Sequence, residues 1–267
     1  MKRLVIFLAV FFLFVSLMSY VTCAQSIIAH YNFEEYGKPV ERGMTFVLGI
    51  TNTYMALDRR TVKDLGPLGN DGILTCGSLS IEEINGEHCF RCTGNRITLP
   101  IEKLNQSAGS IYLRVRWDGQ LNDPKFQFGR QRPFTIYGKG KDGVTMILDY
   151  RSEPVVLSAT YNNYSMGKQY QIHAKELDWD EGSWHELFYT WDTKKGATFY
   201  VDGKFIGQVD MNFILPPDLS DIGVHIGGTQ VLEKEISVLA PWNGLVAEFL
   251  LTDYVLSLAD LDKLLKR

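Results

Sequence analysis

Apolar and polar residues alternate in short runs along most of this chain, and a two-residue period is the side-chain pattern of β-strands. The clearest run is residues 184–191, which is followed by a polar stretch at 192–196 and a second strand-like run at 197–201. Asp202-Gly203 then predicts a hairpin, because a type I′ turn requires positive φ at both central residues and these two tolerate it.

A two-residue turn fixes the register of the hairpin and predicts three facing pairs, Val201–Lys204, Tyr200–Phe205 and Phe199–Ile206. Bulky apolar groups lie on both faces of the hairpin. We therefore expect these two strands to form an inner pair in a layered sheet structure.

Further short alternating runs predict strands at residues 27–33, 73–76, 87–92, 96–99, 110–117, 134–137, 144–150, 155–161, 170–173, 224–226 and 244–251. Ser257 can cap a final helix at 258–265. Regular short strands separated by turns favour an all-β fold, a two-sheet antiparallel β-sandwich with a short C-terminal helix. Because no repeat or linker divides residues 25–267, we expect one domain.

Several of these segments resemble one known family. The Trp184-His185 pair, Thr190-Trp191-Asp192 and the Tyr200–Lys204 hairpin are similar to the laminin-G-like (LamG) branch of the concanavalin A-like lectin/glucanase superfamily. The opening strand, the Gly- and Asn-rich loop at 64–72 and the closing strand before Leu256-Ser257 are also similar. The resemblance implies a jelly-roll sandwich, which hosts lectins, adhesion modules and enzymes and so assigns no function alone.

The overall charge of the chain excludes one class of partner. The 267 residues are 45% hydrophobic and 22% charged, which is ample for a globular core. The net charge is -4 and the pI is near 5.8, so no overall basic field attracts nucleic acid or anionic membranes. We therefore predict no nucleic-acid partner.

Residues 1–24 predict a secretory signal peptide. Lys2 and Arg3 precede an apolar run at 4–18, and small residues before position 25 suit cleavage. A membrane anchor is the alternative, but the run is short. A lipoprotein anchor on Cys23 fits poorly, because Tyr20, Val21 and Thr22 do not match the usual small-residue signal. With no second long apolar segment, the mature chain is predicted to be secreted or extracytoplasmic and to lack a transmembrane segment.

Removal of the signal leaves three cysteines in an oxidising compartment, Cys76, Cys89 and Cys92, which is consistent with one disulfide and one buried thiol. On a strand at 87–92, Phe90 and Cys92 share one face and Cys89 lies on the other. We therefore expect Cys92 in the core and Cys89 paired with Cys76, although spacing cannot establish connectivity. A zinc site needs four ligands, and only His88 lies nearby.

A first candidate chemistry is a pair of catalytic carboxylates, as in glucanases of the superfamily. Glu186 and Asp192 fall on one face of their strand, but no acid lies between them and the Glu-x-Asp-x-x-Glu pattern is absent. No catalytic residue is assigned on this basis.

A second candidate is polysaccharide lyase chemistry, in which a cation or amide neutralises an acidic sugar and a His or Tyr moves the proton. Gln171-Ile172-His173 resembles the Gln-Ile-His of alginate-lyase jelly rolls, and Tyr112, Arg114 and Arg116 alternate onto one strand face. The arginine-rich and tyrosine-rich motifs of those lyases are missing. A solvated outer strand face therefore remains the alternative.

A third candidate is glycan recognition, in which aromatic rings stack on sugars and amides bind hydroxyls. Tyr161-Asn162-Asn163-Tyr164 and Trp179-Asp180 fit this description as loop residues, although a sequon at Asn163 could instead carry a glycan. The other four tryptophans are expected in the core: Trp117, Trp184, Trp191 and Trp242.

The resemblance also implies that calcium could be bound near the first and last strands. However, Ala247 stands at the expected aspartate position, which leaves Glu34, Asp64 and Glu248 as the available acids. We predict no cofactor, with structural calcium left open.

Together these patterns predict a secreted binding module for an extracellular glycan or glycoprotein, with carbohydrate as the ligand. A polysaccharide-active enzyme and a protein-binding adhesion module are the alternatives. The predicted ligand-binding residues are Arg114, Arg116, Tyr161, Gln171, His173 and Trp179.

Overall fold

The structure is a computed structural model, and it describes residues 26–34, 36, 61–76, 80–93, 95–101, 107–118, 130–138, 143–149, 155–163, 167–175, 177, 179–210, 223–228 and 242–266. The predicted signal peptide at 1–24 lies outside these residues. Within them, no helix has the length and apolar character needed to cross a membrane.

Two antiparallel sheets make up the fold. Within the described residues, sheet A contains eight strands, with β1 paired to β16 beside the main order β14 (Lys204–Val209), β13 (Gly196–Val201), β12 (Trp184–Asp192), β7 (Ala108–Trp117), β16 (Gly244–Thr252), β5 (Glu87–Arg91) and β4 (Ile81–Ile84). Strand β1 spans Ile27–Tyr31 and pairs antiparallel with β16.

Sheet B also contains eight strands in the part of the chain described, in the order β11 (Lys168–Ala174), β10 (Val156–Asn163), β9 (Gly143–Asp149), β8 (Arg130–Tyr137), β15 (Gly223–Ile226), β6 (Arg96–Leu99), β3 (Gly72–Cys76) and β2 (Thr61–Val62). Neighbours β15, β6 and β8 come from distant parts of the sequence, so this sheet depends on long-range pairing.

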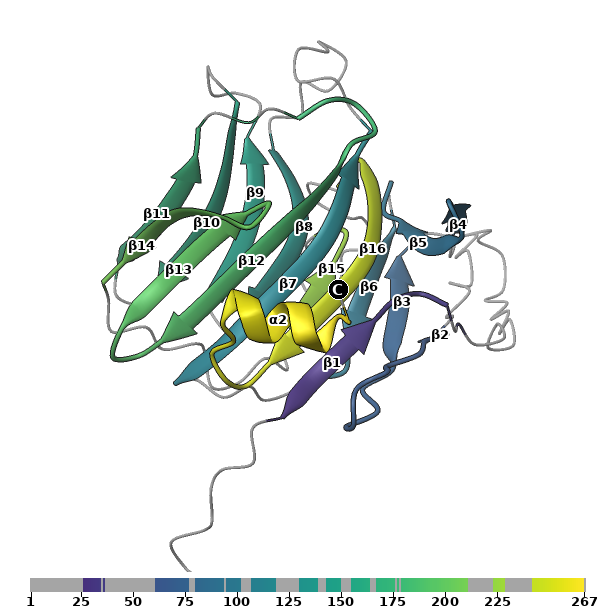
Figure 1. Ribbon diagram of the computed structural model, residues 1–267, viewed down its shortest axis with the longest axis horizontal. Helices are drawn as coiled ribbons and strands as arrows, with labels where there is room; N and C mark the ends of the chain where they lie inside the picture. The colour runs from purple at the N-terminus through teal and green to yellow at the C-terminus, as the bar shows by residue number, and fades with distance from the viewer. Residues whose placement is uncertain are drawn as a thin grey trace, which may run out of the picture.

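The sheets stack face to face, and one apolar cluster fills the space between them. Trp117, Phe134 and Phe249 are fully buried members from β7, β8 and β16. Figure 1 shows sheet A nearer the viewer, with helix α2 (Leu258–Leu264) lying across its outer face. Each sheet therefore has one face in the core and one outer face, and the predicted sandwich with a C-terminal helix is confirmed.

Most predicted strands are confirmed to within four residues at each end, because each has a regular core-facing side. The two-residue strand β2 was missed, and so was strand β4. Its sequence, IEEI, is short and mixed, but Asn85-Gly86 behind it forms the turn to β5 with φ of 54° and 84°. That dipeptide was the signal that could have revealed the strand.

The β13–β14 hairpin turns at Asp202 and Gly203, whose φ values of 51° and 70° confirm the predicted turn. Val201–Lys204 and Tyr200–Phe205 pair as predicted, but a bulge after Phe199 makes it face Gly207 rather than Ile206. The expectation of an inner pair is wrong for β14. It is the edge strand of sheet A, and it lies beside edge strand β11 of sheet B.

Cys89 and Cys92 are both buried free thiols, so the predicted Cys76–Cys89 disulfide is not present in the structure. Cys89 points to the outer side of sheet A, whereas Cys76 belongs to β3 of sheet B. Burial raises the pKa of the Cys89 thiol to about 11. The prediction that Cys92 lies in the main core with Phe90 is confirmed.

Candidate functional site

The outer face of sheet B carries a row of polar pairs between its last two strands. Three directly opposed pairs, Asn162–Gln169, Thr160–Gln171 and Ser158–His173, connect β10 to β11. We call these six residues the β10–β11 ladder. It forms because Leu157, Ala159 and Tyr161 take the core-facing positions of β10, which leaves the alternate positions to the ladder.

Hydrogen bonds hold the ladder side chains in place. Gln169 Nε2 donates to Asn162 Oδ1 at 2.8 Å, and Gln171 Nε2 donates to Thr160 Oγ1 at 3.4 Å. The three β10 members are buried, while Gln169, Gln171 and His173 on β11 are exposed. The ladder therefore presents two anchored amides and one imidazole along an edge strand, and these groups can bind hydroxyls as donors or acceptors.

A row of polar side chains continues inward from Thr160 across four more strands, through four residues in cross-strand register: Thr145, Thr135, His225 and Thr98. The first three of these are buried. Thr135 and Thr145 share a hydrogen bond of 3.2 Å between their hydroxyls, and Thr98 Oγ1 lies 3.0 Å from His225 Nδ1. The face is thus polar across sheet B, and its exposed end is the ladder.

Gln171 and His173 were predicted from the sequence, and the structure places them on the same exposed strand face. Gln169 and the ladder hydroxyls were missed, and Asn162 was predicted in a glycan-binding loop instead of on strand β10. The alternation of residues 158, 160 and 162 with apolar neighbours was the signal that could have found them.

Tyr161 and Trp179 do not offer the exposed rings that glycan stacking requires. Tyr161 is 2% exposed and stacks on Tyr170 inside the sandwich, because β10 extends through Asn163 instead of ending in a loop. Trp179 is 5% exposed, and its ring stacks on His185 with centroids 4.2 Å apart. The prediction of exposed aromatic loop residues is wrong for both.

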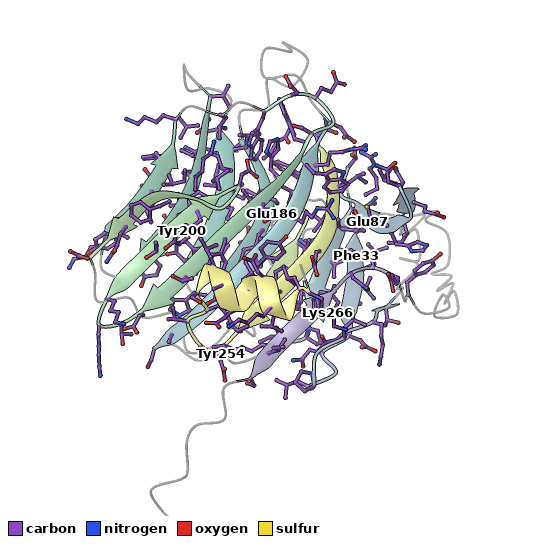
Figure 2. The ribbon with its side chains drawn as sticks, in the orientation of Figure 1. Phe33, Glu87, Glu186, Tyr200, Tyr254 and Lys266 are labelled. Carbon is purple, nitrogen blue, oxygen red and sulfur yellow. The ribbon has the colours of Figure 1, made fainter. Side chains whose placement is uncertain are left out.

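Arg114 and Arg116 lie on the outer face of sheet A. Arg114 is opposite Glu186 in the pairing of β7 with β12, and Glu186 and Glu87 are labelled in Figure 2. Arg114 Nη1 donates to both carboxylate oxygens of Glu87 at 2.7 Å. Both guanidinium groups lie over the ring of Trp184, at 5.0 and 5.8 Å from its centroid. Trp184 is half-buried in a small outer cluster with Cys89 and Leu245, whereas Trp117, Trp191 and Trp242 are in the core as predicted.

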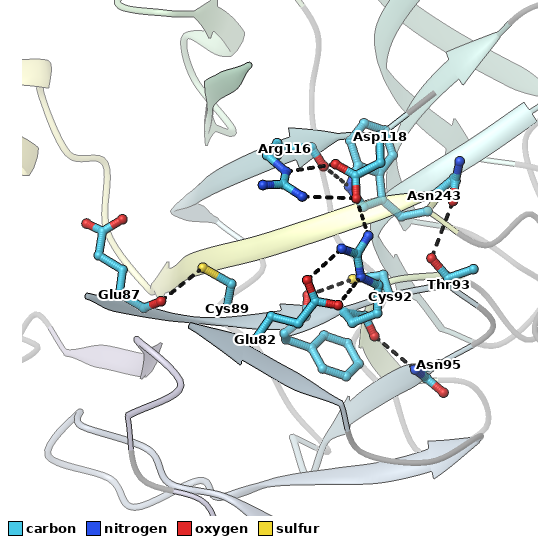
Figure 3. Close-up of polar contacts among 12 residues, drawn as sticks. Glu82, Glu87, Cys89, Cys92, Thr93, Asn95, Arg116, Asp118 and Asn243 are labelled. Carbon is cyan, nitrogen blue, oxygen red and sulfur yellow. Dashed lines mark hydrogen bonds and ion pairs between the residues drawn. The ribbon is translucent and has the colours of Figure 1, made fainter. Parts of the chain in front are cut away.

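An ion-pair network continues from Arg116 on the same face (Figure 3). Arg116 Nε donates to Asp118 Oδ1 at 2.7 Å, Asp118 also pairs with Arg91, and Arg91 binds Glu82 through two 2.7 Å hydrogen bonds. The hydrogen bond from Arg91 lowers the pKa of Glu82. For Asp118, burial opposes ionisation, but the two arginines outweigh it and the pKa is lowered.

The predicted residues do not form one site. Arg114 and Arg116 lie on the outer face of sheet A, while Gln171 and His173 lie on the outer face of sheet B, with the core between them. The lyase constellation of cation, amide and imidazole is therefore not assembled by these four residues. The arginines are already paired with acids, so they do not form the expected cationic surface.

Two of the three acids considered for calcium, Asp64 and Glu248, are engaged in other contacts. Both oxygens of Asp64 accept backbone N–H groups, from His30, Gly66 and Asn70 at 2.7–2.8 Å. Glu248 Oε1 lies 3.1 Å from His30 Nε2. Among the residues that the structure describes, no group of three or more His, Cys, Asp or Glu side chains is arranged to hold a metal ion.

A two-sheet jelly roll with a polar outer face defines a class of β-sandwich modules that includes lectins and enzymes. The chain belongs to the laminin G-like family Laminin_G_3 of the concanavalin A-like lectin/glucanases superfamily, whose profile matches residues 92–262. This confirms the family predicted from the hairpin. A search of curated proteins by sequence found no match.

Several solved structures share the fold. The receptor-binding domain of botulinum neurotoxin type G aligns with a TM-score of 0.55 and 13% identity over 90% of this chain and 51% of that chain. The serotype D binding domain gives 0.56 and 10% over 90% and 51%. The binding domain of Paraclostridial Mosquitocidal Protein 1 gives 0.55 and 15% over 76% and 48%. This chain spans about half the length of each.

Proposed function

We propose that this protein is a secreted binding module and that its ligand is a carbohydrate held at the β10–β11 ladder. The observation that carries the proposal is the exposed row of Gln169, Gln171 and His173. Two of these side chains are fixed by hydrogen bonds to β10. Anchored amides bind hydroxyls with little loss of side-chain entropy, which favours recognition of sugars.

The comparisons support a binding role of a general kind. Proteins with this fold include domains named as receptor-binding domains of neurotoxins and a binding domain of a mosquitocidal protein. The predicted signal peptide and the family both favour an extracellular location, where a glycan or glycoprotein is available as a partner. Residues 25–267 would form the mature module.

Binding to a panel of immobilised polysaccharides and glycoproteins tests the proposal. The protein should be retained by at least one glycan, and Gln171→Ala should weaken its affinity by about tenfold, since the amide contributes a hydrogen bond to the ligand. His173→Ala should weaken the same interaction. Affinity is measured by isothermal calorimetry with the soluble form of the retained glycan.

Gln208→Ala is the matched control, because Gln208 is an exposed glutamine on edge strand β14 of the opposite sheet. It should bind like the unchanged protein. If no glycan is retained and a deglycosylated protein is captured instead, the carbohydrate proposal fails and an adhesion module takes its place. An equal loss of glycan affinity in all three variants would also contradict the assignment of the β10–β11 ladder as the binding site.

A further inference from the structure

Three side chains form a continuous hydrogen-bonded chain at the start of β12. His185 Nε2 lies 2.6 Å from Ser183 Oγ, and His185 Nδ1 lies 2.9 Å from Asp202 Oδ2. The chain joins segment 179–183, which precedes β12, to the hairpin turn between β13 and β14. Trp179, from the same segment, stacks on the His185 ring with an interplanar angle of 12°.

The order of donors and acceptors determines where the protons lie. The Ser183 hydroxyl has one hydrogen, and it donates to the carbonyl oxygen of Asp180 at 2.6 Å. Ser183 Oγ then accepts from His185 Nε2. At the other end, a carboxylate can only accept, so His185 Nδ1 donates to Asp202. Only the doubly protonated imidazolium form of His185 makes all three hydrogen bonds at once.

Asp202 supplies the negative charge that this form requires. Burial acts to raise the pKa of Asp202, but the hydrogen bonds from His185 and from the backbone N–H of Glu186, together with the charges of His185 and Lys204, lower it. The Glu186 N–H donates to Asp202 Oδ1 at 2.8 Å, which fixes the carboxylate. A charged ring is also attracted to the face of Trp179.

The same three residue types form nucleophilic triads in hydrolases, but their roles differ here. In a triad the serine hydroxyl donates to the imidazole, which accepts the proton during attack. Ser183 donates to a backbone carbonyl instead, and its own N–H donates to the same Asp180 oxygen at 3.1 Å. The chain therefore holds a segment of backbone in place.

We propose that His185 is a pH-dependent latch that fastens segment 179–183, with Trp179, to the β13–β14 turn. Asp202 on the turn is the charged group in contact with the ring, and the charge of Lys204 on β14 and the backbone N–H of Glu186 act on Asp202. Because only the doubly protonated ring makes all three hydrogen bonds, loss of a ring proton opens the latch. The latch is also lost in strongly acidic solution, where Asp202 becomes protonated. This happens at a pH below the usual range for an aspartate, because the pKa of Asp202 is lowered.

Nitrogen-15 NMR of the His185 ring, combined with amide hydrogen exchange, tests the latch. At the pH where segment 179–183 is protected, both ring nitrogens should carry protons. The protection factor of the Ser183 amide, corrected for the intrinsic exchange rate, should fall by about tenfold once the NMR spectrum shows that the ring has lost a proton, because one hydrogen bond to a charged group is lost. His185→Gln should remove this stepwise fall in protection.

Ser183→Ala provides a second test that does not depend on the fold tolerating a change at a buried histidine. It removes the oxygen that accepts from Nε2, so the step in protection should disappear. His173→Gln is the matched control, because His173 is exposed on β11, and it should keep the step. A ring with a single proton throughout the protected range, or an unchanged step in Ser183→Ala, overturns the proposal.

Discussion

At the scale of single residues, Asp64 is a buried carboxylate that organises the loop between β2 and β3. Its three accepted hydrogen bonds come from the backbone of β1 and of the loop itself. We expect Asp64→Ala to lower the free energy of unfolding by about 3 kcal/mol, because it leaves buried N–H groups without an acceptor. Urea denaturation followed by tryptophan fluorescence measures this change.

The control for Asp64 is Asp262→Ala, an exposed aspartate of helix α2. Its effect should stay within about 0.5 kcal/mol, as is usual for exposed positions. Similar values for the two variants would show that the loop does not depend on Asp64.

The sequence could predict the residue types of the ladder but not the exposure of every candidate. Gln171 and His173 were found because alternation places them on one strand face. Tyr161 belongs to the core face of β10 and Trp179 packs against His185, and both facts depend on contacts with distant segments. A local pattern cannot distinguish an aromatic residue in a loop from one that another segment covers.

At the scale of secondary structure, helix α2 covers part of the outer face of sheet A. Ser257 caps the helix by accepting from Asp260 N, and Leu261 packs in a cluster with Tyr112 and Phe188. Leu261→Ala should lower the free energy of unfolding by about 2–4 kcal/mol, since it removes a buried side chain and leaves a cavity. Chemical denaturation gives the value.

Lys263→Ala is the control on the same helix, because Lys263 is exposed and pairs with Asp260 on the surface. A change of less than about 0.5 kcal/mol is expected. If Leu261→Ala is equally mild, the helix does not contribute to stability through this cluster.

The sequence predicted the strands that have one side facing the core. It did not predict features that depend on how neighbouring strands pair, such as a bulge or a very short strand. The bulge after Phe199 shifts its partner by one residue, and nothing in the local sequence specifies that shift. Strand β4 has only four residues, so its pattern is too short to stand out. Both features arise from how neighbouring strands fit together.

At the scale of the whole molecule, the arrangement of strands into two sheets separates residues that the sequence analysis grouped as one predicted ligand-binding set. Arg114 and Gln171 both occupy polar strand positions, but β7 belongs to sheet A and β11 to sheet B. Sheet membership depends on pairing between distant segments, such as β15 between β6 and β8. The sequence therefore predicted the sandwich, while the composition of each outer face required the structure.

The ionised carboxylates give the whole molecule a pH-dependent stability. The pKa values of Glu82, Asp118 and Asp202 are all lowered in the folded protein. The unfolded chain therefore binds more protons in acid, so the stability they contribute is present above the usual carboxyl range and is lost as the pH falls through their folded pKa values. The free energy of unfolding should be lower at pH 3 than at pH 7.

Asp118→Asn tests whether the arginine network is responsible. At pH 7 it should lower the free energy of unfolding by about 2 kcal/mol, because charge-assisted hydrogen bonds to Arg91 and Arg116 are weakened. Between pH 7 and pH 3 it should then lose less stability than the unchanged protein, since a titrating group has been removed. Glu83→Gln, an exposed neighbour on β4, should keep the full pH dependence. If Asp118→Asn loses as much stability in acid as Glu83→Gln, the acid sensitivity comes from carboxylates outside this network.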